Sequence, residues 1–490
     1  MSENQADTTQ IAIIGAGLAG LGIAIQLQNA GIDDWIILEK KDGIGGTWRD
    51  NSYPGSGCDV PSMFYSFSFE PKTDWTQKFP GQAEILEYVN ACAEKHDLHR
   101  NIRLNKELEK ATFDEESATW NITTTDGDTL TSQFLISGVG QLNRPSYPNI
   151  KGRDTFQGKT IHTARWDHDY DLNDKTVAVI GNGGSAIQMI PPVALEVKHM
   201  TIFQRSANWV FPKPDRPFSD RERAIFTKVP FVNKLYRAFL WFMFEIRWPM
   251  FQKNTKLGRK AQAQTEQDIR SKISDPKLLE ACIPDYPIGC KRILISNEYY
   301  DTLHQDNVDV TMDHITEITP DSVITEDGTE TKVDTILYAT GFQTSDFLAP
   351  MNIIGTKEKR LDETWKNGAE AYLGITLDGF PNFFMLYGPN TNLGHNSIIL
   401  MLELQMRYII NCIKILNRDN LKSMQLRPDI MREYSVEVQD SLTHSVWDAS
   451  CGSWYKNEDG KIVNNWPYST VQYWWRTLYP DFAVFDTQAR

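Results

Sequence analysis

The fold is decided by Ile11-Ala12-Ile13-Ile14-Gly15-Ala16-Gly17-Leu18-Ala19-Gly20, near the start of a 490-residue chain. Its β-branched run predicts a strand, its glycines a tight turn, and the apolar spacing from Leu18 to Asn29 a helix. In this order, G-x-G-x-x-G lets the backbone approach a pyrophosphate, which the helix N-terminus stabilises. The stretch therefore predicts a Rossmann-like dinucleotide-binding fold.

The next strand supports this interpretation. Trp35 to Leu38 predicts a second strand, and Glu39 stands at its end. A carboxylate there can accept both ribose hydroxyls of an adenosine. The alternative, a glycine-rich turn that binds nothing, is disfavoured because strand, glycines, helix, strand and acid occur in register.

A second signature of the same kind lies further along the chain. Lys175 to Ile180 predicts a strand that leads into Gly181-Asn182-Gly183-Gly184-Ser185-Ala186 and a helix that Pro191-Pro192 is expected to break. After the following strand, Gln204-Arg205-Ser206 stands where an NAD site would place its acid. A cation there favours a 2'-phosphate, so the second cofactor is predicted to be NADPH. The alternative is that Arg205 pairs with a surface carboxylate.

Composition limits the function classes. A hydrophobic content of 41% is that of an ordinary globular protein, and a net charge of -14 argues against a nucleic-acid partner. The six cysteines include no C-x-x-C pair, which predicts neither a metal site nor a disulfide framework, but reduced thiols. Met1 to Gln10 is polar without an apolar run, so a cytoplasmic location is expected.

A helical, aromatic-rich insertion is predicted between about 210 and 285. Its longest uncharged apolar stretch, Ala238 to Phe244, is far shorter than the roughly 20 residues that span a bilayer. Packing over a substrate channel is favoured over an interfacial membrane helix.

Two later segments are expected to return to the first sheet: the strand Thr335 to Tyr338 and the run Phe383 to Pro389. The fold class is thus α/β, with two Rossmann-like domains and a helical insertion in the second. The expected parts are a polar tail (1–10), the first part of the first domain (11–150), a linker (151–170), the second domain (171–335), and the rest of the first domain with a C-terminal segment (336–490).

Several polar residues stand in loops between these parts. On chemistry alone, Asp59 is most often a solvated turn residue or cap, Lys291-Arg292 a solvated patch, and Trp454 either core or a ring that stacks on a nicotinamide. His162 is open to three interpretations: a hinge residue, a cofactor contact or a loop histidine.

The order of these motifs resembles the type I Baeyer-Villiger monooxygenases, a branch of the class B flavoprotein monooxygenases. The linker matches that family's fingerprint, F-x-G-x-x-x-H-x-x-x-W followed by P or D, as Phe156, Gly158, His162, Trp166 and Asp167. G-G-T-W, C-D-V, K-R and A-T-G follow the family's order, and the resemblance covers roughly residues 11 to 478. The segment from about 451 is less family-wide.

The resemblance implies FAD at the first fold and NADPH at the second. Arg292 would be the catalytic arginine and Asp59 the carboxylate that positions it. The FAD positions would be Gly15, Ala16, Gly17, Gly20, Glu39, Gly46, Thr47, Trp48, Asp59 and Tyr65. The NADPH positions would be Gly181, Asn182, Gly183, Gly184, Ser185, Gln188, Arg205, Ser206, Lys291 and Trp454.

The implied activity is the NADPH- and O2-dependent conversion of apolar ketones to esters or lactones through a C4a-peroxyflavin, with sulfoxidation as a side activity. The nearest rival is an N-hydroxylating or S-oxygenating flavin-containing monooxygenase, which Trp166-Asp167 disfavours. A flavin-binding redox sensor is the non-enzymatic alternative. The sequence predicts neither the particular ketone nor the oligomeric state.

Overall fold

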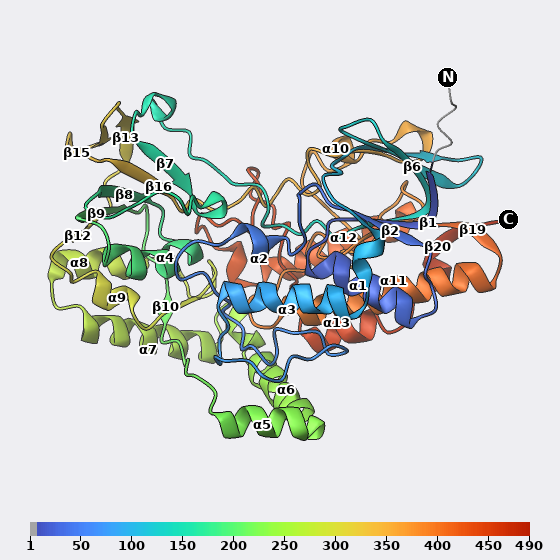
Figure 1. Cartoon of the computed structure of the whole chain (residues 1–490), viewed down its shortest axis with the longest axis horizontal. Helices are drawn as coiled ribbons and strands as arrows, with labels where there is room; N and C mark the ends of the chain where they lie inside the picture. Colours follow the sequence, from blue (N-terminus) through green and yellow to red (C-terminus); the bar gives the residue numbers. More distant parts are fainter. Residues whose placement is uncertain (1–6) are drawn as a thin grey trace.

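Two sheets with parallel strands at their centres lie toward opposite ends of the molecule's long axis (Figure 1). The computed structural model describes residues 7–490. The first sheet has the order β17-β4-β5-β6-β1-β2-β3, with β18 paired to β6. Its strands are β1 (Asp7–Ile14), β2 (Trp35–Leu38), β3 (Ile102–Arg103), β4 (Leu108–Asp114), β5 (Thr119–Thr124), β6 (Thr129–Ser137), β17 (Asn352–Ile354) and β18 (Phe383–Met385).

The glycine signature forms the predicted turn between β1 and α1 (Leu18–Asn29). A Cβ on Gly20 would lie 1.9 Å from the carbonyl oxygen of Gly15, so only glycine permits this close approach. β1 pairs in parallel with β2 and β6, and Ile13 and Ile37 are fully buried between the covering helices. Strand β1 starts at Asp7, which corrects the predicted tail of residues 1–10; residues 1–6 of that tail lie outside the described residues.

The second sheet is entirely parallel, with the order β12-β9-β8-β16-β7. Its strands are β7 (Lys159–His162), β8 (Thr176–Ile180), β9 (His199–Phe203), β12 (Val308–Thr311) and β16 (Thr335–Tyr338). The fingerprint linker thus supplies the edge strand β7 rather than a free connection.

Strand β16 corrects one prediction. Thr335 to Tyr338 was expected in the first sheet, but it pairs with β8 and β7 in the second. The run is buried along its whole length, and a short apolar strand fits either sheet equally well, so its pattern cannot assign it. The return to the first sheet comes later, when β18 pairs with β6 as predicted.

The helix after the second glycine turn also differs from the prediction. α4 (Gly184–Ala194) does not break at Ile190 but continues through Pro191 and Pro192. Its C-terminal half is held by packing, since Pro191, Val193 and Ala194 are buried. This burial offsets the two N–H donors that the prolines lack.

The helical insertion is confirmed and bridges the two halves. Its helices are α5 (Asp220–Lys228), α6 (Pro230–Glu245), α7 (Lys256–Lys272) and α8 (Pro276–Cys282). Phe226 of α5 and Leu240 of α6 belong to the core of the first half, whereas Ile269 of α7 and Cys282 of α8 belong to that of the second. The hairpin of α5 and α6 projects at the lower edge of Figure 1.

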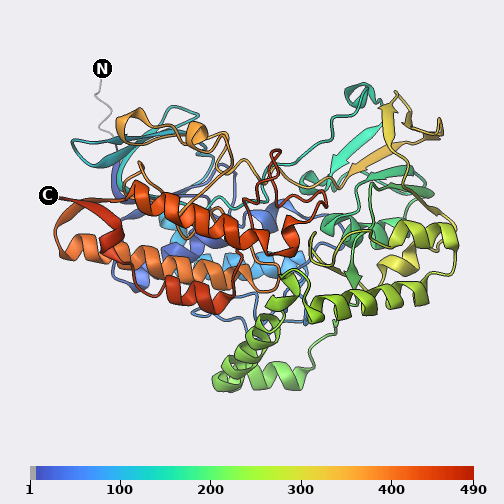
Figure 2. The same ribbon diagram turned by 180° about the vertical axis from the view of Figure 1, so that it is seen from behind.

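C-terminal helices cover the first half on the side seen in Figure 2. They are α11 (Ile398–Arg418), α12 (Pro428–Thr443) and α13 (Thr470–Arg476), and α11 contacts α1 directly. The remaining helices and strands are α2 (Thr47–Asp50), α3 (Gln82–Lys95), α9 (Tyr299–Thr302), α10 (Leu361–Thr364), β10 (Val210–Phe211), β11 (Leu294–Ile295), β13 (Ile315–Ile318), β14 (Ser322–Thr325), β15 (Glu330–Lys332), β19 (Leu421–Leu426) and β20 (Phe485–Ala489). Short 3-10 helices are η1 (Leu98–Asn101), η2 (Arg153–Thr155), η3 (Thr163–Arg165), η4 (Trp248–Phe251), η5 (Thr356–Glu358), η6 (Val446–Asp448) and η7 (Phe482–Val484).

The cysteines correct a further prediction. Cys290 and Cys451 form a disulfide, although all six thiols were expected to be reduced. The two residues are 161 positions apart and meet only through the fold, so sequence spacing gave no sign of the pair. The other four cysteines are free and buried.

From residue 7 to the C-terminus, no helix combines the length and the apolar character needed to cross a membrane.

Candidate active site

A cavity of about 1570 Å³ runs between the two sheets and is reached by both glycine turns. It also touches α6 and the C-terminal segment. Most predicted site residues line it: Gly15, Gly17, Glu39, Gly46, Thr47, Trp48, Asp59, Tyr65, Gly181, Asn182, Gly183, Gly184, Ser185, Gln188, Arg205, Ser206, Lys291, Arg292 and Trp454. Ala16, Gly20 and the fingerprint residues do not line it.

Glu39 is fixed at the end of β2 beside the first glycine turn. Its carboxylate accepts hydrogen bonds from the backbone N–H groups of Ala16 at 2.7 Å and Lys41 at 2.9 Å. These bonds leave further lone pairs that face the cavity. Nearby, the indole N–H of Trp48 donates to the hydroxyl of Tyr65 at 3.1 Å, which orders two aromatic rings in the cavity wall.

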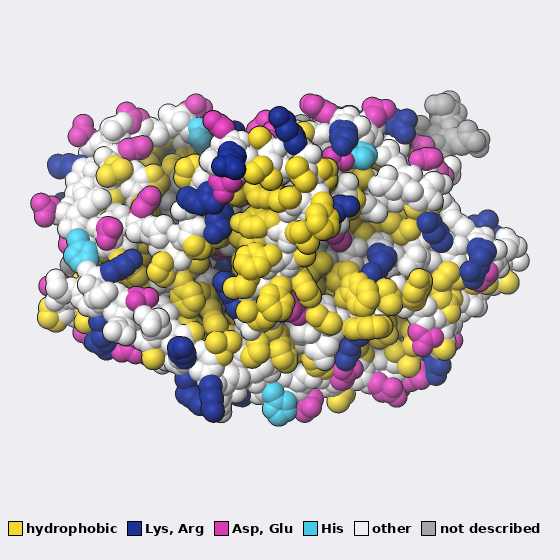
Figure 3. Space-filling view, turned by 90° about the horizontal axis from the view of Figure 1, so that it is seen from below, with side chains coloured by type: hydrophobic (Ala, Val, Ile, Leu, Met, Phe, Trp, Pro, Cys, Tyr) yellow, Lys and Arg dark blue, Asp and Glu magenta, His cyan; other side chains and the backbone are white. Residues whose placement is uncertain are grey.

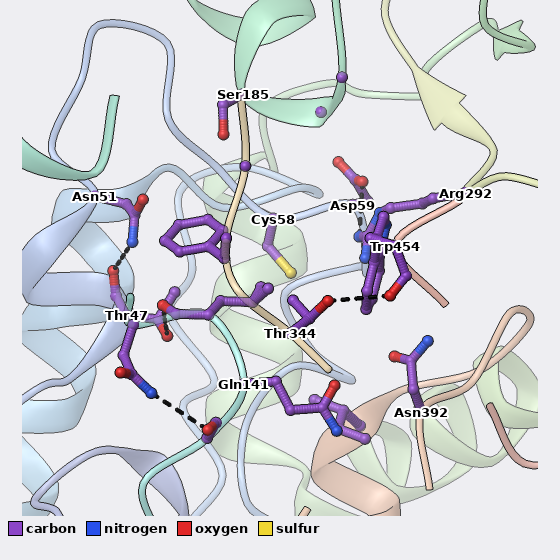
Figure 4. A pocket seen from close by; sticks show the side chains of 18 of the residues that line it. Thr47, Asn51, Cys58, Asp59, Gln141, Ser185, Arg292, Thr344, Asn392 and Trp454 are labelled. Atoms are coloured by element: carbon purple, nitrogen blue, oxygen red, sulfur yellow. Dashed lines mark hydrogen bonds and ion pairs between the residues drawn. The ribbon is translucent and has the colours of Figure 1, made fainter. Parts of the chain in front are cut away.

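Asp59 and Arg292 meet in the cavity, as Figure 4 shows. The guanidinium Nη2 lies 2.9 Å from Oδ2 of Asp59. Asp59 comes from the loop after α2, and Arg292 from the segment just before β11, so the ion pair joins the two halves. Arg292 lies deep in the molecule, yet 47% of its side chain is exposed because it faces the open cavity.

The surroundings of Arg292 keep it charged. Burial opposes the charge, but the Asp59 carboxylate outweighs this effect and raises the pKa of Arg292. The adjacent Cys58 stays a neutral thiol, because burial raises its pKa to about 12. Burial likewise raises the pKa of Tyr455 to about 12. The pair therefore stands among neutral neighbours.

Gln188 of α4 connects the second glycine turn to the Asp59 loop. Its Oε1 accepts from the Tyr53 hydroxyl at 2.7 Å, and its Nε2 donates to the Gly57 carbonyl at 3.0 Å. Nε2 also lies 3.4 Å from Oδ1 of Asp59. Gln188 thus holds the loop that carries Asp59 against the second half, a contact that its sequence position did not reveal.

A cationic site forms beyond the second glycine turn. Lys291 Nζ donates to the hydroxyl of Ser206 at 2.5 Å and lies 4.6 Å from the ring centre of Tyr286. Burial, and then the nearby Arg205, lowers the pKa of Lys291. Between residues 7 and 490 no carboxylate forms a salt bridge with Arg205, contrary to the alternative of a surface ion pair. Two cations and a hydroxyl here suit a phosphate group.

The fingerprint residues build the edge of the second sheet. Gly158 is required there, because a Cβ would lie 2.4 Å from the carbonyl oxygen of Asp334. Phe156 packs against the neighbouring hydrophobic cluster, Trp166 is half-buried, and Asp167 pairs with Lys159 at 2.5 Å.

His162 ends β7 and is only 2% exposed. Its Nδ1 accepts from the backbone N–H of Ala164 at 3.0 Å, while Nε2 has no partner among the described residues. Burial lowers the pKa of His162 to about 4, so the ring is neutral at physiological pH. It packs edge-on against Tyr147, outside the cavity.

Other cavity residues were missed by sequence reasoning. Tyr387 donates from its hydroxyl to Asn392 at 2.8 Å, and both line the cavity. Asn392 is labelled in Figure 4. Gln141 and Thr344 also line it. The only signal was their place beside segments already noted, such as the A-T-G run before Thr344. No described residues form a group of His, Cys, Asp and Glu that could hold a metal ion.

Two dinucleotide folds that share one cavity define a two-cofactor oxidoreductase. Residues 12–219 match the model of a family described as pyridine nucleotide-disulphide oxidoreductase. A Baeyer-Villiger monooxygenase from Streptomyces coelicolor is 41% identical over 97% of this chain and 92% of its own. The chain belongs to the Baeyer-Villiger monooxygenase family.

Solved structures agree with this membership. An oxidized steroid monooxygenase bound to NADP superposes with a TM-score of 0.88 at 29% identity, over 99% of this chain and all of that one. OTEMO in complex with FAD and NADP superposes with a TM-score of 0.88 at 26% identity, over the same shares. The two Rossmann-type domains predicted from the sequence are therefore confirmed.

Proposed function

We propose that the protein is an NADPH- and O2-dependent monooxygenase that converts ketones to esters or lactones, with FAD at the first sheet and NADPH at the second. The observation that carries the proposal is the Asp59–Arg292 ion pair, which lies in the cavity that both glycine turns border. Family membership supports the same activity.

The residues present fit both cofactors. The turn after β1, the fixed carboxylate of Glu39 and the ordered rings of Trp48 and Tyr65 suit a flavin dinucleotide. At the second turn, Arg205, Ser206 and Lys291 suit the 2'-phosphate of NADPH. We assign Trp454, which lines the same cavity as Arg292, to the nicotinamide end.

When bound, NADPH would supply two electrons and the reduced flavin would react with dioxygen. Arg292 keeps its positive charge at every relevant pH, so it can stabilise the negative charge that develops on oxygen during attack on the ketone. Asp59, 2.9 Å away, holds the guanidinium toward the cavity. Gln188 and Tyr53 hold the Asp59 loop in turn.

The substrate class follows from the cavity wall beside α6. Leu240, Met243 and Phe244 line it together with Met250 and Phe251. An apolar wall of this kind accepts the hydrocarbon part of a ketone and excludes water. We therefore propose an apolar ketone as substrate.

The fingerprint has a structural role in this proposal. It forms the edge strand of the second sheet and lies outside the cavity. We propose that His162 holds the junction between the two halves in register and does not transfer a proton. The limits of the two domains, apart from the start of β1 and the place of β16, stay a prediction.

The proposal is tested with Arg292→Ala. We expect FAD content and NADPH consumption to persist, while ester formation falls by about 100- to 1000-fold, since the charge that stabilises the oxygen anion is lost. Ester is measured by gas chromatography and mass spectrometry, and hydrogen peroxide by a coupled assay. Arg418→Ala, at an exposed position on α11, is the matched control. A normal ester yield from Arg292→Ala would remove Arg292 from this role.

A further inference from the structure

An unpartnered apolar row runs along the outer face of α6. It consists of Phe231, Leu235, Phe239 and Phe242 of α6 and of Ile246, which caps its C-terminus, each between 47% and 66% exposed. Their spacing places all five on one side of a helix. We call these residues the outward row. Figure 3, viewed from the side on which α5 and α6 project, shows hydrophobic side chains gathered across the centre of this face.

The outward row is held in place by the opposite face of α6. Arg237 donates to the carbonyl of Ser66 at 3.1 Å and to its hydroxyl at 2.9 Å. Trp241 donates to the hydroxyl of Thr470 at 3.1 Å, and Glu245 accepts from the backbone N–H of Thr470 at 2.8 Å. Because α6 is anchored to the first half and to α13, it cannot rotate its outward row inward.

The segment that carries the row is strongly basic. Residues 220–260 contain ten Lys and Arg but three Asp and Glu, a net charge of +7 in a chain with a net charge of -14. Lys228 and Lys234 flank the row, are exposed, and form no salt bridge among the described residues. At physiological ionic strength charges act over about 8 Å, so a docked surface would sense these cations rather than the distant acidic residues.

Exposed aromatic residues also occur at α13, which α6 contacts through Thr470. Trp475 and Tyr479 lie at the end of this helix and just after it, and both are exposed. Figures 1 and 2 place α13 on the same lower side as α6. Trp and Tyr side chains favour the headgroup level of a bilayer, because their rings are apolar with a polar edge.

We propose that this face docks on an anionic lipid surface, with the outward row buried among the acyl chains and the flanking cations against the headgroups. A basic helix with one apolar face is the recognised form of an interfacial lipid-binding helix. Charge complementarity selects an anionic bilayer over a second copy of this acidic chain. The sequence favoured packing over a channel, and α6 does both, since Phe239 belongs to the row and also lines the cavity.

The test is co-sedimentation of the flavin-loaded enzyme with vesicles, either of phosphatidylcholine alone or of phosphatidylcholine with phosphatidylglycerol. We expect binding to the anionic vesicles to exceed binding to the neutral ones by at least about tenfold and to weaken in high salt. Lys228→Gln with Lys234→Gln is expected to weaken binding by about fivefold per charge removed. Phe231→Ser with Phe242→Ser is expected to abolish it. None of these four residues lines the cavity.

Matched controls replace exposed side chains on other surfaces. Val436→Ser removes an exposed apolar residue from α12, and Lys332→Gln with Lys366→Gln removes two exposed cations. Both controls are expected to bind like the parent enzyme. Equal binding by the parent and the Phe231 and Phe242 variant overturns the proposal, as does absence of binding to anionic vesicles. The proposal is also overturned if the enzyme is a dimer without lipid and the same two substitutions make it dissociate. The face would then bind a second copy of the chain.

Discussion

At the scale of single residues, we propose that the choice between NADPH and NADH depends on Arg205, just after β9. The guanidinium lines the cavity beside Ser206 and Lys291, where two cations and a hydroxyl suit a phosphate. NADH lacks the 2'-phosphate, so the same side chain has nothing to bind there.

Arg205→Ala tests this assignment. We expect the KM for NADPH to rise by about tenfold or more, because a charge-assisted contact to the phosphate is lost, while the KM for NADH changes less than about twofold. Steady-state kinetics with each nicotinamide provides the measurement. Arg270→Ala on α7, exposed and remote from the cavity, serves as the control. Equal changes in the KM for NADPH and for NADH would show that Arg205 does not bind the 2'-phosphate.

Residues close in sequence were predictable, and residues that meet across the fold were not. The glycines before α1 and Glu39 after β2 belong to one local pattern, so their place in the cavity follows from spacing. Asp59 and Arg292 are 233 positions apart, and only the family resemblance brought them together. Nothing in the sequence linked Gln188 to Gly57, because that contact depends on how the two halves meet.

At the scale of elements, β7 carries the buried residue His162, and protonation of this side chain destabilises the folded state. The pKa of His162 is about 4 in the folded protein, whereas an unfolded histidine titrates near 6.5. Above about pH 6.5 the His162 ring is neutral in both the folded and the unfolded protein, so its titration does not change the stability. As the pH falls below this value the unfolded state takes up the proton first, so the folded state loses stability.

At about pH 5, the titration of His162 is expected to lower the free energy of unfolding by about 2 kcal/mol relative to neutral pH. His162→Asn should lower stability at neutral pH, but it should lose less on acidification, because its amide does not titrate. Thermal unfolding midpoints at both pH values measure the difference, with His444→Asn, at an exposed position, as the control. If the variant and the parent lose the same amount, His162 is not the group that binds the proton.

Two elements were predicted wrongly from their sequence patterns. The strand Thr335 to Tyr338 was recognised as a strand, but its sheet was assigned wrongly, since a fully buried apolar run has no face that marks its neighbours. The end of α4 was wrong for a related reason. Burial of Pro191 and the residues after it outweighs the local preference of proline to break a helix.

At the scale of the whole molecule, the disulfide joins the segment before Lys291 to the C-terminal segment that carries Trp454. It closes a loop of 161 residues, and closing a loop of this length stabilises a fold by about 2–5 kcal/mol. The pair overturns the expectation that all six thiols are reduced.

Thiol counting checks the disulfide. We expect four reactive thiols in the denatured, unreduced protein and six after reduction. Cys290→Ser and Cys451→Ser should lower the Tm equally, because each breaks the same link. The double variant should then be no less stable than either single variant. Six thiols before reduction would contradict the pair.

The division of the Asp59–Arg292 ion pair between the two halves has a consequence for how they come together. Asp59 is carried by one half and Arg292 by the other, so their 2.9 Å contact exists only while the halves are together. The attraction between opposite charges weakens with distance, so the ion pair stabilises the arrangement in which the two halves are in contact. By thermodynamic linkage, any molecule that binds to both halves and favours their contact also favours formation of the Asp59–Arg292 ion pair. The Arg292 charge that we propose to serve the chemistry is thus paired with Asp59 only when the two halves are in contact.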